Sequence, residues 1–154
     1  MMRELLFIIS VVCLVSCKAQ KEVKPVGEQM EDLVLIEQDN FSSIESFETR
    51  VIRDAKSLRK FYMEINKTRK PGLPVPIIDF SKEMVLLVCA GEQSEEKAVH
   101  LSKLKETATE LSVAVQMWDK EKKGDMAILP VYYPFYLYKL PITDKSIDFQ
   151  KVDN

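Results

Sequence analysis

One segment of the chain places its apolar residues at helical spacing, within the stretch RDAKSLRKFYMEINK. The apolar positions are Leu58, Phe61, Tyr62 and Ile65. A stripe with this period forms one face of an amphipathic helix, and the carboxylate of Asp54 can cap the first turn. Three prolines in the following stretch, KPGLPVP, prevent the helix from continuing. The pattern therefore predicts one main helix that begins after Asp54 and ends before this proline-rich link.

Most of the remaining pattern predicts β-strands. Residues 84–90 are uniformly apolar, which is typical of a central strand covered on both faces. The segments KAVHLSKLK and ELSVAVQMW flank the polar residues ETAT and predict a hairpin, in which the second strand alternates between dry and wet positions. Further strands are expected in LVLIEQ, FETRVIR and KSIDFQKV. The sum is an α+β domain, a single antiparallel β-sheet with the main amphipathic helix packed on it.

An aromatic run lies near the C-terminus, in YYPFYLYKLP. Its prolines, together with Pro130, cannot donate to a β-ladder, so we expect this region to be bulged, broken or at a sheet edge. Alternation along a strand sends some of the aromatic side chains into the core and others to the surface. Exposed aromatic residues are common at protein interfaces. We therefore take Tyr132, Tyr136 and Tyr138 as a candidate partner surface, with core packing of partly exposed tyrosines as the alternative.

The N-terminal stretch LLFIISVVCLVSCKAQK contains a short apolar run. The run from Leu5 to Val15 is about 11 residues, or ~16 Å of helix at ~1.5 Å per residue. A bilayer core of ~30 Å needs about 20 apolar residues, so the run is too short to span it. With Arg3 ahead of it, the run instead matches the apolar core of a secretory signal peptide.

The end of this run, from Leu14 to Cys17, resembles the lipobox of bacterial lipoproteins, in which small residues precede an obligatory cysteine. The resemblance implies a signal peptide over residues 1–16, transfer of a diacylglycerol to the sulfur of Cys17, and acylation of the new N-terminus. Several acyl chains anchor a protein stably to a membrane. The polar residues 17–32 are then expected to form a lipidated flexible tether, and residues 33–154 the folded domain.

The charge balance argues against a nucleic-acid partner. The 154 residues include 24 acidic and 22 basic ones, for a net charge of −2, and no basic stripe stands out along the sequence. Of the three cysteines, Cys13 leaves with the signal peptide and Cys17 carries lipid, so Cys89 alone remains in the domain. An intramolecular disulfide is thereby excluded. Cys89, in its apolar run, is expected to be a buried small hydrophobe.

Residue types that carry catalysis are scarce. His100 is the only histidine, and alternation places it on the wet face of its strand with Ser102, as a surface residue without a role. No nucleophile motif or phosphate-binding glycine loop accompanies it, and a zinc site needs several His or Cys ligands. Glu92, Glu95 and Glu96 cluster on an expected loop, where they either bind calcium weakly or, as we favour, form a solvated turn. We therefore expect no enzyme activity, no metal and no cofactor, and we add Glu92 and Glu95 to the candidate partner surface.

Over residues 48–150 the chain resembles the PrcB-like domain of protease-complex lipoproteins. The matching features are the amphipathic helix, the proline-rich link, the stretch IIDFSKEMVLLVCAGEQ and the closing strand YYPFYLYKLP. The resemblance implies an α+β fold and a place beside an envelope protease. The family commonly has threonine-glycine-glycine-tyrosine after the glycine that ends its central strand, whereas this chain has EQSEEKAV after Gly91. The role of that loop in the family is therefore not carried over.

Together these features favour an interaction protein of the bacterial cell envelope, anchored by lipid at Cys17, that docks or stabilises a protein partner. A protease complex is the candidate partner. In well-studied lipoproteins an aspartate after the lipidated cysteine favours the inner membrane, so Lys18 points to the outer membrane. The alternative is a protease inhibitor or a ligand-binding module that acts through its loops, and a hydrolase is the least favoured interpretation.

Overall fold

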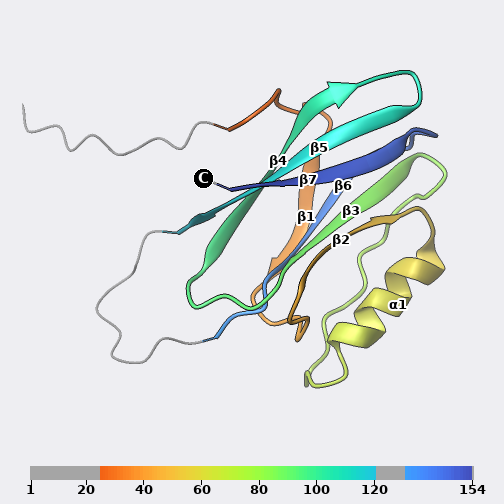
Figure 1. Cartoon of the computed structure of the whole chain (residues 1–154). Coiled ribbons are helices and arrows are strands. Elements are labelled where there is room, and N and C mark those ends of the chain that lie inside the picture. Colours follow the sequence, from red (N-terminus) through yellow and green to blue (C-terminus); the bar gives the residue numbers. More distant parts are fainter. Residues whose placement is uncertain (1–24, 121–130, 154) are drawn as a thin grey trace, which may run out of the picture.

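The computed structural model describes residues 25–120 and 131–153, which form two β-sheets and one helix (Figure 1). In chain order the elements are β1 (Val34–Asp39), β2 (Phe47–Ile52), α1 (Ala55–Ile65), β3 (Glu83–Ala90), β4 (Lys97–Glu106), β5 (Glu110–Asp119), β6 (Phe135–Pro141) and β7 (Ser146–Val152). The first sheet has the strand order β1-β6-β3-β2, and the second has the order β4-β5-β7. The second sheet packs on one face of the first, and α1 covers the other face.

The expectation of a single antiparallel sheet is wrong, although the described residues, mostly strand with one helix, are in keeping with an α+β class. β5 and β7 pair in parallel, because the chain crosses from the first sheet to the second after β6 and then runs alongside β5 in the same direction. The physical reason for two sheets lies in β3. One helix can cover only one face of a strand that is apolar on both faces, so a second layer must cover the other.

β3 is the centre of both cores. Val85, Leu87 and Cys89 face α1, whereas Met84, Leu86 and Val88 face the second sheet. All of these side chains are buried, which confirms the prediction of a central strand covered on both faces. Full burial of one aliphatic side chain contributes ~1.5–3 kcal/mol, so this single strand accounts for a large part of the apolar burial.

The helix α1 matches its prediction. Asp54 is the N-cap, and its Oδ1 accepts the backbone N–H of Ser57 at 2.8 Å. The four apolar residues predicted from the helical spacing are all buried against the first sheet. After the helix ends at Ile65, the side-chain amide of Asn66 donates to Leu73 O at 2.9 Å and accepts from Leu73 N at 2.8 Å. This pair of hydrogen bonds fixes the start of the proline-rich link, which returns beside the helix (Figure 1).

β6 lies in the interior of the first sheet, between β1 and β3, so of the expected alternatives (bulged, broken or at an edge) the edge position is wrong. Pro134 precedes the strand and Pro141 is its last residue, so the N–H groups between them remain free to donate. The irregularity in the β1–β6 pair lies on the β1 side, between Leu35 and Glu37. Pro130, which also entered the prediction, lies outside the described residues.

Part of the expected tether is bound to the second sheet. Residues 17–24 lie outside the described part of the chain, but Val26 N donates to Gln116 Oε1 at 2.6 Å, and Ser102 Oγ donates to Val26 O. Ser102 and Gln116, which stood at wet positions of their predicted strands, are both buried. They stay polar and dry because the N-terminal segment covers them and satisfies their hydrogen bonds. From Val26 onwards the chain therefore belongs to the fold and is not a free tether.

Cys89 tests the packing of β3. The side chain is fully buried, and burial raises the pKa of its thiol to about 12, so it is a neutral, inert group at neutral pH. We expect Cys89→Asp to lower the free energy of unfolding by about 3–5 kcal/mol, because it leaves an unpaired charge in the core. Cys89→Ala, the control, leaves only a small cavity and is expected to cost about 1–2 kcal/mol. Urea unfolding measures both, and equal stability of the two variants would contradict the burial of this strand.

Candidate partner-binding surface

Three loops meet at one end of the first sheet, to the left of α1 in the lower half of Figure 1: the β1–β2 loop, the β3–β4 loop and the segment that leads into β6. Gln93 and Tyr132 exchange two backbone hydrogen bonds, each 2.8 Å long. Tyr133 N donates to Asn40 O at 2.8 Å, and Ser42 N donates to Tyr133 O at 2.9 Å. Because the main chains are paired, the side chains on these loops are held on one frame.

The side chains that are exposed or partly exposed at this end form what we call the end-loop surface: Phe41, Glu92, Gln93, Val131, Tyr132 and Tyr133. Phe41 and Val131 are 55% and 48% exposed, a large fraction for apolar side chains. The rings of Phe41 and Tyr132 lie 6.3 Å apart, tilted by 36°, within the usual range of aromatic pairs. The end-loop surface therefore presents aromatic and aliphatic groups to solvent beside a carboxylate.

The main chain at Phe41 is held by hydrogen bonds to side chains of the neighbouring segments. Asp39 Oδ1 accepts the N–H of Phe41 at 2.8 Å, and Asp39 also forms an ion pair with Arg69. The guanidinium of Arg69 donates to Phe41 O at 2.9 Å. The N–H and the carbonyl of Phe41 are thus both held by hydrogen bonds, which fixes the main chain from which its exposed ring projects.

Gly91 sets the course of the β3–β4 loop. It ends β3 with φ of +75°, and a Cβ at this position would lie 2.8 Å from Phe47 N. A side chain would therefore be both strained and in collision with the backbone. The next residue, Glu92, donates its N–H to Glu45 O at 3.0 Å, which ties this loop to the β1–β2 loop.

Glu92 and Tyr133 form the polar part of the surface. Tyr133 Oη donates to Glu92 Oε2 at 3.1 Å. This hydrogen bond raises the pKa of Tyr133, because the carboxylate holds the phenolic proton and repels the phenolate. Among the residues predicted for the partner surface, the structure thus brings Glu92 and Tyr132 to the same end of the molecule.

Tyr136 and Tyr138 were predicted at the partner surface, and this prediction is wrong. Their exposed fractions are only 2% and 7%. Tyr136 donates its hydroxyl to Lys97 O, and Tyr138 donates to Val99 O at 2.7 Å. Burial raises the pKa of Tyr136 to about 12 and raises the pKa of Tyr138 as well. Alternation correctly sent both to one face of their strand, but that face is covered by the second sheet, and the hydroxyls join the two sheets.

The loop carboxylates do not gather into a metal site. Glu95 is half-buried further along the β3–β4 loop, and Glu96 forms an ion pair with Lys120 at 3.7 Å. Within residues 25–120 and 131–153, no group of three His, Cys, Asp or Glu side chains is close enough to hold a metal ion. Glu95, which the sequence assigned to the partner surface, therefore lies on the same loop as Glu92, but the polar pair at the surface is made by Glu92.

His100 packs against an aromatic side chain. Its ring centroid lies 5.9 Å from that of Trp118, and its Nε2 is buried without a hydrogen-bond partner. The prediction of a surface histidine is therefore only partly right, because the residue is half-buried. The contact with Trp118 is a packing contact on the outer side of the second sheet.

A groove of about 480 Å³ lies away from the end-loop surface, between the N-terminal segment, the end of β4 and the β6–β7 loop. Its two lysines are already neutralised. Lys103 Nζ lies 3.2 Å from Glu28 Oε2 and 3.3 Å from Glu106 Oε2, and Lys145 Nζ lies 2.6 Å from Glu106 Oε1. An anionic ligand would have to break these pairs, so we rank the groove below the end-loop surface.

No helix in the described part of the chain is long and apolar enough to cross a membrane. Comparison of the chain with protein-family models, with curated proteins and with solved structures finds no match.

Phe41 and Val131 were missed by reasoning from the sequence. Phe41 is a lone aromatic residue in the polar stretch QDNFSS, and an apolar side chain in the middle of a polar turn is a signal that could have found it. Val131 stands between Pro130 and the aromatic run, so its exposure had no signal of its own.

The Glu92–Tyr133 pair predicts a pKa change. In Glu92→Gln the pKa of Tyr133 should fall toward the ordinary value of about 10, because a neutral amide does not repel the phenolate. Titration of ring-labelled tyrosine by NMR measures this, and the buried Tyr136 and Tyr138, whose raised pKa values have another cause, serve as internal controls. An unchanged pKa of Tyr133 would show that the hydrogen bond is absent in solution.

Proposed function

We propose that the protein is a lipid-anchored interaction protein of the bacterial cell envelope that docks or stabilises a protein partner through the end-loop surface. The observation that supports this most is the exposure of Phe41 and Val131 on loops whose main chains are paired with one another. Aromatic anchors that need no reordering on binding are typical of interface hot spots. Such a surface provides affinity without any catalytic group.

The proposed anchor is Cys17, on the strength of the lipobox-like residues that precede it. The first contact of the described fold with the second sheet is made by Val26. The chain between Cys17 and Pro25 spans at most about 29 Å even when fully extended, at ~3.6 Å per residue. A lipidated Cys17 would therefore hold the domain close to the membrane, and Lys18 favours the outer membrane.

A protease complex is the partner that the resemblance to PrcB-like domains suggests, and it belongs to the proposal on that ground alone. The second candidate function is a protease inhibitor or ligand-binding module. The groove beside the N-terminal segment favours the ligand-binding module, because it combines apolar side chains such as Leu111 and Leu140 with charged ones. Because the charged residues that line the groove are ion-paired, we consider the groove a weaker candidate site than the end-loop surface.

The anchor is tested by Cys17→Ser. Without a sulfur at this position no diacylglycerol can be attached, so the protein should move from the membrane fraction to the soluble fraction of the cells that produce it. Cys13→Ser, the control, changes a cysteine of the expected signal peptide and should leave the protein in the membrane fraction. A Cys17→Ser protein that still pellets with membranes after a high-salt wash would contradict the lipoprotein proposal.

The end-loop surface is tested by crosslinking in the envelope, followed by purification of the lipidated chain and mass spectrometry. We expect a recurrent envelope protein that is recovered with the unchanged chain and reduced about tenfold or more by Phe41→Glu, because hot-spot losses of 1.4 kcal/mol or more are common. Ile77→Glu is the matched control, since Ile77 is a fully exposed apolar residue outside the surface. Equal recovery with both variants, or no recurrent protein, would contradict this docking role.

A further inference from the structure

The outer side of α1 carries a second exposed surface, of a different chemistry. We call it the helix face, and its residues are Lys56, Arg59, Lys60, Met63 and Lys67. The first four lie on α1 opposite the buried apolar stripe, and Lys67 continues their row in the turn that follows. All five side chains are exposed. The net charge of the whole chain is close to zero, but positive charge is concentrated on the helix face.

The cations of the helix face outnumber the carboxylates near them. Residues 53–70 contain seven basic residues and only two acidic ones, Asp54 and Glu64. Asp54 caps the helix through Ser57 and also attracts Lys56, and Glu64 lies 3.2 Å from Arg50 on the neighbouring β2. No ion pair involving the lysines or the arginine of the helix face occurs in the part of the chain that the structure describes. Their charge is thus available to a partner.

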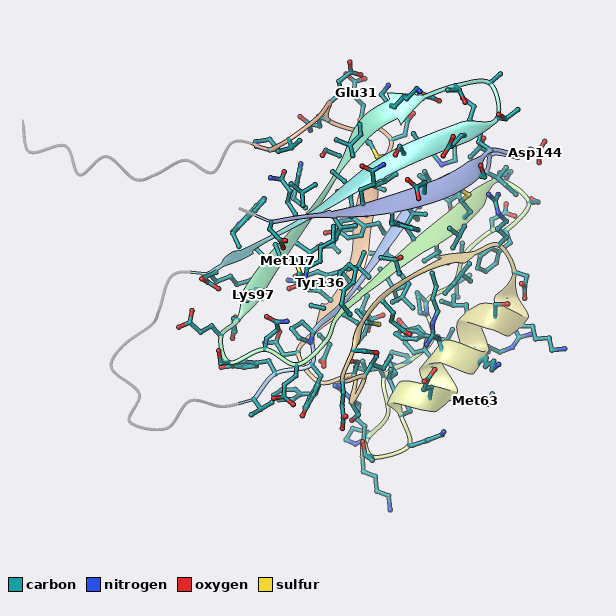
Figure 2. All side chains as sticks on the ribbon, in the orientation of Figure 1. Glu31, Met63, Lys97, Met117, Tyr136 and Asp144 are labelled. Atoms are coloured by element: carbon teal, nitrogen blue, oxygen red, sulfur yellow. The ribbon has the colours of Figure 1, made fainter. Side chains whose placement is uncertain are left out.

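Met63 adds an apolar contact in the middle of this charge. It is 66% exposed, and Figure 2 shows it pointing away from both sheets. From Lys56 to Lys67 the row is ~16 Å long at ~1.5 Å per residue, which is the length of about five residues of an extended chain. A short peptide segment with carboxylates on either side of one apolar residue fits both the charge and the length.

The position of the helix face favours a polypeptide over a membrane as its binding partner. α1 covers the outer face of the first sheet, whereas Val26 is bound to the outer face of the second. α1 and Val26 therefore lie on opposite sides of the layered fold (Figure 1). On the proposed anchoring at Cys17, on which this step rests, the membrane lies on the side of Val26 and the helix face is directed away from it.

We propose that the helix face binds an acidic polypeptide segment of a partner protein, on the side of the domain that is turned away from its lipid anchor. The contact is electrostatic with one apolar centre. Its strength must fall as salt rises, because exposed charges are screened beyond ~10 Å at 0.1 M salt. Each exposed ion pair contributes little, so several cations have to act together.

The experiment uses the full chain as it is purified from the cells that produce it, in micelles of a nonionic detergent. The probe is a fluorescein-labelled, unstructured peptide that contains glutamates around a central leucine, and fluorescence anisotropy measures its affinity. We expect Lys60→Glu with Lys67→Glu to weaken binding about tenfold. The matched control, Lys82→Glu with Lys105→Glu, makes the same charge change at exposed lysines outside the helix face and should bind as the unchanged chain does.

Two further measurements keep the result decisive. Met63→Gln removes the apolar centre without changing charge, and it should weaken binding even if the charge reversals disturb the helix. Phosphatidylcholine vesicles containing phosphatidylglycerol, and a labelled single-stranded oligonucleotide, are offered in place of the peptide. Equal peptide affinity in the reversal and control variants, or a preference for the vesicles or the oligonucleotide, would overturn the proposal. Because the assay is made in detergent, its result does not depend on whether Cys17→Ser releases the protein from membranes.

Discussion

The burial of β3 on both faces is the constraint on which the rest of the structure depends. A strand with consecutive apolar residues sends alternate side chains in opposite directions, so no single layer can remove them all from water. α1 receives Val85, Leu87 and Cys89, and the second sheet receives Met84, Leu86 and Val88. The layered order of helix, sheet and sheet follows from this requirement. Gly91 then ends the strand with a backbone that no side chain could adopt without collision, and the chain leaves the core at that point.

The second sheet creates polar requirements of its own. Its outer face contains Ser102 and Gln116, which are both buried, and Val26 forms a hydrogen bond with each of them. A buried polar group without a partner costs about 1–3 kcal/mol, so the N-terminal segment has a structural reason to stay docked. The same segment leads directly to the proposed lipid anchor. On the proposed anchoring, the side of the domain nearest Cys17 is therefore set by hydrogen bonds within the fold, and the opposite side carries α1.

The sequence predicted elements better than it predicted their arrangement. The helical spacing that ends at Ile65 and the Asp54 cap specify α1 from local information, and the observed helix agrees with both. The pattern of β6 states which side chains share a face, but not what covers that face. Tyr136 and Tyr138 were therefore placed in solvent, whereas a second sheet lies over them. Which strands join which sheet depends on contacts between residues far apart in the chain, and such contacts produce no periodic pattern in the sequence.

The two proposed surfaces would act on binding in different ways. Aromatic and aliphatic groups on a fixed frame, such as Phe41 and Val131, act mainly on the rate at which a complex dissociates, because their water is released only in close contact. Exposed cations such as Lys60 act at longer range, so they raise the rate of encounter with an acidic partner in addition to the affinity that they contribute together. The carboxylate of Glu92 at the end-loop surface has the opposite sign. A partner whose acidic region faces the helix face and whose basic region faces Glu92 would be attracted at both places. The same partner turned around would be repelled at both. For a domain held near a membrane by a short segment, charge of both signs at separate places would favour one docking orientation before the aromatic contacts form.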